Sequence, residues 1–346
     1  GKSGGTGNYS SMVFTVPDKR ISVAVIAAGK ESGAMKIALD VLDAVLVGKK
    51  LLAKEERPVP VPPKAQKLPQ DHASWSGYYA NGAVLGQVVF DAEKDAATLY
   101  AFKGQEKVPA GTFIYNNGHY HDNEGNRYYF TKVGNEVYFV SSPPDVGIDM
   151  IAMQKVKPQE KPKSLNSDVD NKAWLRRNVG PFEGTMIVES HFARSFLYKD
   201  LPGYVFFQGM HRIDSPEFAG MPFDAIRDQA ELTLFEKDGL TWAWVSDLLY
   251  SPTEAAAPLK AGENSVKIGG DGYNQWLVAG EDVVVSFKKP EKGRIIIFTP
   301  DDMTIYDSAV DTGDAYVAKG SYIECTGLAN DVFTINVGPV TANEKK

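Results

Sequence analysis

Short apolar segments separated by turn residues run through most of this 346-residue chain. Between residues 73 and 156 they include Gln87–Phe90, Arg127–Phe130 and Glu136–Val140, which are rich in Val, Tyr and Phe. Asn-Gly and Gly-Asn pairs stand between such segments, which is typical of antiparallel hairpins. We therefore expect residues 73–156 to form a small antiparallel β-barrel and the chain to be mainly β.

Residues 171–340 are also rich in strand-like segments, but longer loops separate them. Leu240–Val245, Asp282–Phe287 and Arg294–Phe298 are examples. The wider spacing favours a β-sandwich or jelly-roll-like domain over a tight meander. At the start of this region we expect a short helix over Asn171–Asn178.

Two polar segments divide the chain. The run Pro58–Lys64 contains four prolines and is typical of a stiff polyproline-type linker, and Lys155–Lys163 is a second polar run. We place linkers at residues 51–72 and 157–170, and domains at residues 1–50, 73–156 and 171–340.

Residues 1–50 have a different pattern from the rest. A strand at Met12–Val16, a turn at Pro17 and an apolar strand at Ile21–Ala27 precede a helix that ends at Gly48. The second strand is apolar throughout, and we expect it to be internal and covered on both faces. Ser32 is a candidate N-cap for the helix.

The expected helix carries one broad apolar face, with Ile37, Val41 and Val45 beside Ala38, Leu42 and Leu46. Two strands and one helix cannot bury their own apolar faces. The cover must come from a missing N-terminal half, from another copy of the chain or from the adjacent β-domains.

The run Gly1-Lys2-Ser3-Gly4-Gly5 carries the most specific chemical signal. A phosphate-binding loop is the weaker interpretation, because that motif needs a glycine five residues before the Gly-Lys pair and a strand before that. Lys2-Ser3-Gly4 matches the Lys-Ser/Thr-Gly motif of serine penicillin-recognising enzymes, and the strands and helix follow in the order of that fold. The segment resembles the C-terminal end of the serine β-lactamase and D-alanyl-D-alanine peptidase family. The resemblance is greatest to class C-like serine hydrolases and D-aminopeptidases with appended β-barrel domains.

The resemblance implies that residues 1–50 are the strand-strand-helix remnant of an α/β transpeptidase-like fold. It also implies roles for three residues. The backbone N–H of Gly5 would be an oxyanion donor, the Lys2 ammonium would orient a substrate carboxylate, and the Ser3 hydroxyl would donate to that carboxylate. No cofactor is implied.

The family's nucleophile motif, Ser-x-x-Lys, does not precede Lys2 in this sequence. The resemblance implies that the parent protein is a bacterial, penicillin-binding-protein-like serine peptidase or hydrolase. It would hydrolyse amides or esters, such as small D-amino-acid peptides or cell-wall fragments, and this chain alone would be inactive. The alternatives are a Gly-rich N-terminal arm without a catalytic role, and a binding module whose β-domains recognise a glycan, peptide or protein partner.

Other candidate sites are weaker. His119 and His121 lie on the same face of an expected strand, as zinc ligands often do, but an ordinary hairpin end explains them better than a metal site. We interpret His72, His211 and the run Glu189-Ser190-His191 as structural, with His211 in a loop. Five aspartates could hold calcium, but turn residues are the simpler interpretation; they are Asp301, Asp302, Asp307, Asp311 and Asp314.

Aromatic residues are plentiful, and we assign most of them to β cores. Tyr273–Trp276 is the segment in which we expect an exposed ring. The lone cysteine, Cys325, is expected to be a buried small apolar residue.

Composition limits the partners of the chain. The net charge of −7 argues against nucleic acid or an anionic membrane as the main partner. No segment has the run of about 20 apolar residues that spans a bilayer, and we expect no membrane span. Bacterial extracytoplasmic and cytoplasmic locations both stay open.

Overall fold

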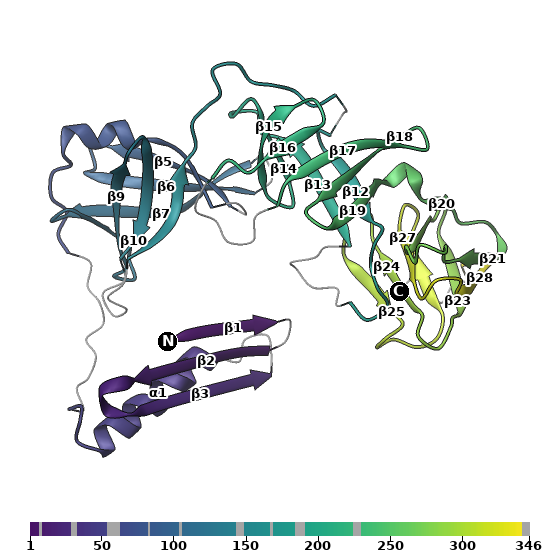
Figure 1. Ribbon diagram of the computed structural model, residues 1–346, viewed down its shortest axis with the longest axis horizontal. Coiled ribbons are helices and arrows are strands. Elements are labelled where there is room, and N and C mark those ends of the chain that lie inside the picture. Colours follow the sequence, from purple (N-terminus) through teal and green to yellow (C-terminus); the bar gives the residue numbers. More distant parts are fainter. Residues whose placement is uncertain are drawn as a thin grey trace. The chain divides into compact units, whose positions relative to one another are not determined.

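A computed structural model shows that the chain is mainly β, as expected (Figure 1). It describes residues 1–6, 9–28, 33–53, 63–81, 84–103, 106–142, 149–166, 169–183, 191–223 and 230–340. The chain divides into two compact units. The first is largely Gly1–Pro60, and the second comprises Val61–Glu183 and Ser190–Lys346.

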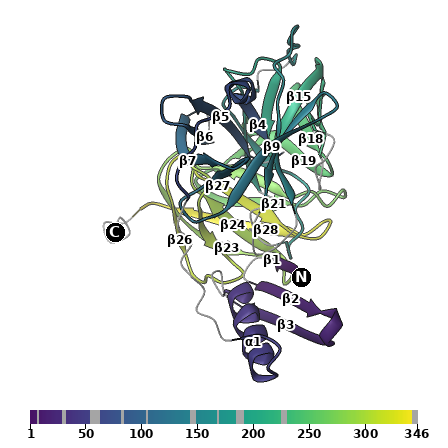
Figure 2. The ribbon, with the colours of Figure 1, turned by 90° about the vertical axis from the view of Figure 1, so that its left-hand side faces the viewer.

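The first unit is a three-stranded antiparallel sheet with one helix. Its strands lie in the order β1 (Lys2–Thr6), β2 (Tyr9–Val16) and β3 (Ile21–Ala28). A single 3-10 turn, η1 (Pro17–Lys19), joins β2 to β3. The helix α1 (Ala34–Gly48) packs along β2 and β3 (Figure 2). The expected strand, turn, strand and helix are therefore present, and Ser32 lies outside the described residues.

Only one face of this sheet is covered by α1. Ala38 and Leu42 of the helix pack against Met12 and Val23 of the strands. The broad apolar face expected for the helix is thus only partly buried, because Ile37 is 44% exposed. A three-stranded sheet is too narrow to cover the second row of apolar side chains.

The prediction that Ile21–Ala27 is an internal strand covered on both faces is wrong. The strand β3 lies at an edge of the sheet. Val23 is buried beneath α1, whereas Ile26, on the opposite face, is 81% exposed. The apolar composition does not distinguish the two arrangements, because it contains no period-2 alternation that would indicate a solvent face.

The second unit begins with a closed antiparallel barrel, which confirms the expectation of a small barrel. Its core includes Tyr79, Val88, Phe113, Tyr120 and Phe130. The short helix η2 (Gln70–Trp75) precedes the first strand. The strands are β4 (Gly77–Ala80), β5 (Leu85–Asp91), β6 (Ala96–Lys103), β7 (Glu106–Asn116), β8 (His119–His121), β9 (Arg127–Val133), β10 (Glu136–Ser141) and β11 (Met150–Lys155).

A second closed antiparallel barrel follows. Its strands are β12 (Lys172–Arg176), β13 (Phe192–Leu197), β14 (Tyr204–Phe207), β15 (Met210–Ser215), β16 (Phe218–Gly220), β17 (Leu232–Lys237), β18 (Leu240–Val245) and β19 (Leu248–Pro252). The prediction of a helix over Asn171–Asn178 is wrong, because Lys172–Arg176 form the strand β12, which pairs with β13 and β19. Trp174 is fully buried in the barrel and its Nε1 donates to Ser195 Oγ at 2.7 Å. This tertiary packing overrides the local helical pattern.

Two further sheets complete the second unit. One has the order β20 (Ala257–Pro258), β22 (Gln275–Val278), β27 (Tyr322–Thr326), β24 (Arg294–Phe298) and β25 (Thr304–Asp307). The other has the order β21 (Gly262–Lys267), β28 (Val332–Gly338), β23 (Val283–Lys288) and β26 (Ala315–Val317). Their side chains share one core that contains Val285, Ile295, Phe333 and Ile335. Residues 171–340 therefore contain a closed barrel followed by a two-sheet sandwich, where a single sandwich-like domain was expected.

The parts of the second unit are joined by apolar clusters. Leu85, on β5, and Val156, which follows β11, share a cluster with Leu201 and Met210 of the second barrel. Leu175 of the second barrel shares a cluster with Trp276 and Ile296 of the sandwich. No helix among the described residues is long and apolar enough to cross a membrane.

Candidate functional site

The residues of the Lys-Ser-Gly motif lie on β1, an edge strand of the first unit. In the register with β2, Lys2 is opposite Val13, Ser3 is opposite Met12 and Gly4 is opposite Ser11. All of the motif residues are exposed. The structure thus presents the motif on an accessible strand, with one long edge that pairs with no described strand.

Alternation along β1 sends the motif side chains to both faces of the sheet. Met12 packs against α1, so its cross-strand partner Ser3 lies on the helix side. Lys2 and its partner Val13 lie on the opposite face, which α1 does not cover. The Lys2 ammonium and the Ser3 hydroxyl can therefore reach one ligand only at the open edge of β1, where the long Lys2 side chain can bend around the strand.

The backbone of β1 directs hydrogen-bonding groups to that edge. Thr6 of β1 is opposite Tyr9 of β2, and only two residues separate them in the sequence. In a hairpin with a two-residue loop, the two residues that flank the loop form a hydrogen-bonded pair. Hydrogen-bonded and non-bonded pairs alternate along an antiparallel ladder, so the N–H and C=O groups of Gly4 point toward β2. The Ser11 hydroxyl also donates to Gly4 O at 3.3 Å. Ser3 and Gly5 then direct their N–H and C=O groups away from β2. The edge offers donors to a carbonyl, a carboxylate or an extended peptide.

The two glycines of the motif have different packing. A Cβ on Gly4 would lie 2.8 Å from Ser11 Oγ, closer than ordinary contacts allow. A Cβ on Gly5 would lie 3.5 Å from Tyr9 O, an ordinary contact distance. Gly4 is therefore suited to its position by its lack of a side chain, whereas Gly5 contributes its backbone.

The nucleophile motif of the resembled family has one match in the sequence, Ser286-Phe287-Lys288-Lys289. It begins on the strand β23. Residues three apart lie on opposite faces of a strand, whereas a helix would place them on one face. Lys289 Nζ instead donates to Gly293 O at 2.8 Å. This pair cannot act as a nucleophile and its base.

His119 and His121 lie on the same strand, β8, with ring centroids 6.3 Å apart. Burial, and then the neighbouring His119, lower the pKa of His121. His119 Nδ1 contacts Asn117 O at 3.2 Å. Over the part of the chain that the structure describes, no group of three or more His, Cys, Asp or Glu side chains could hold a metal ion.

Two other histidines are core residues with partners that the sequence does not indicate. His72 Nδ1 lies 2.5 Å from the Tyr120 hydroxyl, and its ring stacks on Trp75. The expectation that His211 lies in a loop is wrong, because it is buried on β15 and its Nε2 lies 2.9 Å from Phe207 O. Burial lowers the pKa of both imidazoles.

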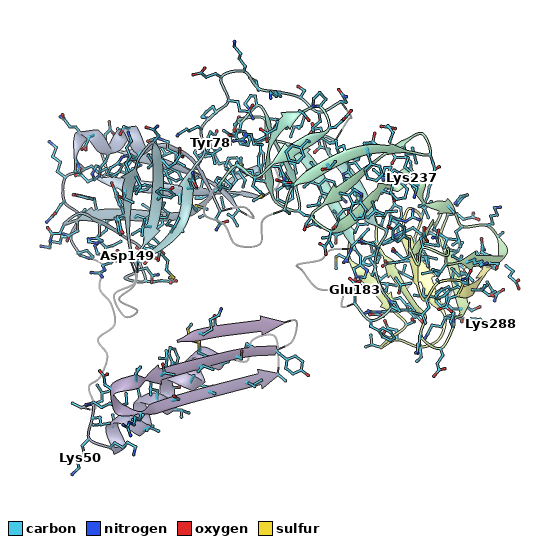
Figure 3. The ribbon with its side chains drawn as sticks, viewed as in Figure 1. Lys50, Tyr78, Asp149, Glu183, Lys237 and Lys288 are labelled. Atoms are coloured by element: carbon cyan, nitrogen blue, oxygen red, sulfur yellow. The ribbon has the colours of Figure 1, made fainter. Side chains whose placement is uncertain are left out.

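His191 belongs to a buried polar network between the second barrel and the sandwich. Its Nδ1 lies 2.6 Å from Glu324 Oε2, and both side chains are fully buried. Asn274 Nδ2 donates to the other carboxylate oxygen of Glu324 at 2.5 Å and to Arg176 O at 2.9 Å. Arg176 also forms an ion pair with Glu183 at 2.9 Å, and Glu183 is labelled in Figure 3. Glu189 and Ser190 lie outside the described residues.

The remaining candidates are structural. Arg294 Nε donates to Asp307 Oδ1 at 2.8 Å, and Asp311 accepts from the Asp307 N–H at 2.8 Å, so these carboxylates have turn and ion-pair roles. The expected exposed ring is wrong for Trp276, which is 2% exposed and donates to Arg176 O from Nε1. Cys325 is buried as expected, and burial raises the pKa of its thiol.

No protein-family model matches the chain, and no curated protein matches it either. A functional assignment therefore depends on the chemistry and geometry of the sites described above.

Proposed function

We propose that the first unit is the substrate-binding wall of a β-lactamase-like serine hydrolase that acts on amides or esters. The observation that carries this proposal is the open edge of β1, to which Ser3 and Gly5 direct backbone donors. An acyl substrate placed along this edge would meet the Gly5 N–H as an oxyanion donor. Its carboxylate would meet the Lys2 ammonium and the Ser3 hydroxyl.

The arrangement around the edge supports the same proposal. The face that carries Lys2 is free of α1, so a substrate and a second protein layer can approach it. Gly4 and Gly5 add no side chains that would obstruct a substrate backbone. An edge strand of this kind is a general site for binding an extended peptide by β-augmentation.

The nucleophile of the proposed enzyme must come from a segment outside this sequence. Its only Ser-x-x-Lys match cannot serve, because Ser286 lies on β23, whereas Lys289 follows the end of this strand and donates to Gly293 O. The chain would therefore bind a substrate carboxylate weakly and would not cleave an acyl bond by this mechanism.

The test uses the purified chain with glycine labelled by ¹⁵N and a D-alanyl-D-alanine dipeptide as ligand. We expect the Gly5 amide resonance, assigned by its loss in Gly5→Ala, to shift on titration. Lys2→Ala should weaken the titration by about tenfold or more, because it removes a charge-assisted hydrogen bond. Lys36→Ala is the matched control, since Lys36 lies on α1 and pairs with Asp40.

The same preparation should not hydrolyse nitrocefin or a D-amino-acid anilide. Hydrolysis that copurifies with the chain, or a Gly5 resonance that the dipeptide does not move, would contradict the proposal. If Lys2→Ala responds to the dipeptide as the wild type does, Lys2 has no part in the proposed binding.

A further inference from the structure

A pocket of about 180 Å³ lies where the two barrels meet. Tyr78, Leu85 and Phe102 line it from β4, β5 and β6 of the first barrel. Residues 198–201, in the connection between β13 and β14 of the second barrel, line the other side. Figure 3 labels Tyr78 on the side of the first barrel that faces the second.

The pocket is held by the apolar cluster that joins the barrels. Leu85 and Leu201 are both buried members of this cluster, together with Tyr198. The β13–β14 connection is held by backbone hydrogen bonds from Leu201 N to Tyr198 O and from Tyr204 N to Leu201 O, each 3.2 Å long. Both walls of the pocket are therefore formed before any ligand arrives, which reduces the entropy lost on binding.

Aromatic rings form much of the pocket wall. Tyr78 and Phe102 have ring centroids 6.1 Å apart and are tilted against each other. Tyr198 adds a third ring, and its burial raises the pKa of its hydroxyl. Rings that surround a small space attract an organic cation through their faces.

Two charged groups stand at the same pocket. Burial, followed by the negative charge of the Asp200 carboxylate, raises the pKa of the Tyr78 hydroxyl. Tyr78 therefore stays protonated at neutral pH, and the Asp200 carboxylate keeps its lone pairs for a ligand. Lys199, next in sequence, supplies a positive charge at the exposed side of the pocket.

We propose that this pocket binds a small zwitterion, a free α-amino acid. The ligand ammonium lies against Asp200 and the aromatic rings, and the ligand carboxylate pairs with Lys199. Leu85 and Leu201 give an apolar floor for a side chain such as that of leucine. The lone positive charge of Lys199 disfavours a ligand that is only a cation, and Asp200 disfavours one that is only an anion. This inference does not depend on the hydrolytic role of the first unit.

The test is calorimetric titration of the whole chain with four probes. Leucine carries both charges, leucinamide lacks the carboxylate, N-acetylleucine lacks the ammonium, and glucose tests recognition of a sugar by the rings. We expect saturable binding of leucine, weaker binding of leucinamide and no binding of N-acetylleucine or glucose.

Variants separate the two charges. Asp200→Asn should weaken the binding of leucine and leucinamide by about tenfold or more, because the ammonium loses its charged acceptor. Lys199→Gln should weaken the binding of leucine and strengthen that of leucinamide, because the variant no longer repels a ligand that is only a cation. Asp238→Asn is the matched control, since it makes the same carboxylate-to-amide change in the turn between β17 and β18, where asparagine tolerates a φ of 54°.

Circular dichroism shows whether each variant is folded. The proposal is overturned if the folded wild-type chain binds no leucine, if glucose binds in its place, or if Asp200→Asn binds leucine as well as the wild type does.

Discussion

At the scale of single residues, burial decides what the ionisable groups of this chain do. His191 and Glu324 are both fully buried and lie 2.6 Å apart, and Asn274 holds the second carboxylate oxygen of Glu324. A charged or proton-sharing pair is tolerated there because each polar atom has a partner. This pair and the Asn274 amide connect the second barrel to the sandwich.

Removal of His191 should destabilise that connection strongly. In His191→Ala the Glu324 carboxylate stays buried with Asn274 as its remaining described partner, and loss of one member of a buried pair costs about 3–5 kcal/mol. Calorimetric unfolding should show this loss in the transition that includes the sandwich. Lys36→Ala breaks an exposed pair and should cost about 1 kcal/mol or less. Similar effects of the two substitutions would contradict the role given to His191.

At the scale of the element, the strand β1 has one edge that pairs with no described strand and one face that α1 does not cover. Gly4 and Gly5 are adjacent but their surroundings differ, because only the Gly4 position is close to the Ser11 hydroxyl. The opposite edge of the sheet, β3, has the same open character, with Ile26 exposed. One helix covers one face of a three-stranded sheet, and the pattern of exposure follows from that geometry.

The two glycines should therefore respond differently to alanine. Gly4→Ala should destabilise the first unit by about 1 kcal/mol, because the new Cβ turns the Ser11 hydroxyl away from its hydrogen bond to Gly4 O. Gly5→Ala meets only an ordinary contact and should change stability by about 0.5 kcal/mol or less. Hydrogen exchange of the β1 and β2 amides measures both. If Gly5→Ala opens this hairpin more readily than Gly4→Ala does, the described register of β1 is wrong.

At the scale of the whole molecule, each barrel of the second unit contains a buried histidine with a lowered pKa. His72 belongs to the first barrel and His211 to the second. The unfolded chain binds a proton near the ordinary histidine pKa of 6.5, whereas the folded chain binds it only at lower pH. Between these two values the unfolded state holds more protons, so stability falls as the pH decreases through this window.

Acidification from pH 7.5 to pH 5.5 should therefore lower the midpoint of thermal unfolding of the second unit. The loss from each histidine is at most about 1.4 kcal/mol for each pH unit below 6.5. His211→Gln, which keeps an amide donor for Phe207 O, should have a flatter pH profile than the wild type. His119→Gln, at the half-buried start of β8, is the control. If the pH profile of His211→Gln equals that of the wild type, His211 is not the source of the pH dependence.

Much of the architecture could be predicted from the sequence. Alternation of apolar residues and turn pairs is a local signal, so strands such as Glu136–Ser141 and Leu240–Val245 and the helix ending at Gly48 were expected from nearby residues alone. The strand β12 was not, because the burial of Trp174 comes from strands far along the chain.

Tertiary structure alone decided which strands close into barrels, which face of the first sheet stays open and which distant residues meet. His191 and Glu324 are 133 residues apart, and Tyr78 and Asp200 line one pocket from different barrels. Such contacts carry no local pattern, since they depend on the register and closure of whole sheets. The sequence by itself determined the β character, the turns and the presence of the Lys-Ser-Gly run. Long-range packing determined where buried charges pair, where the β1 edge opens and where the pocket between the barrels forms.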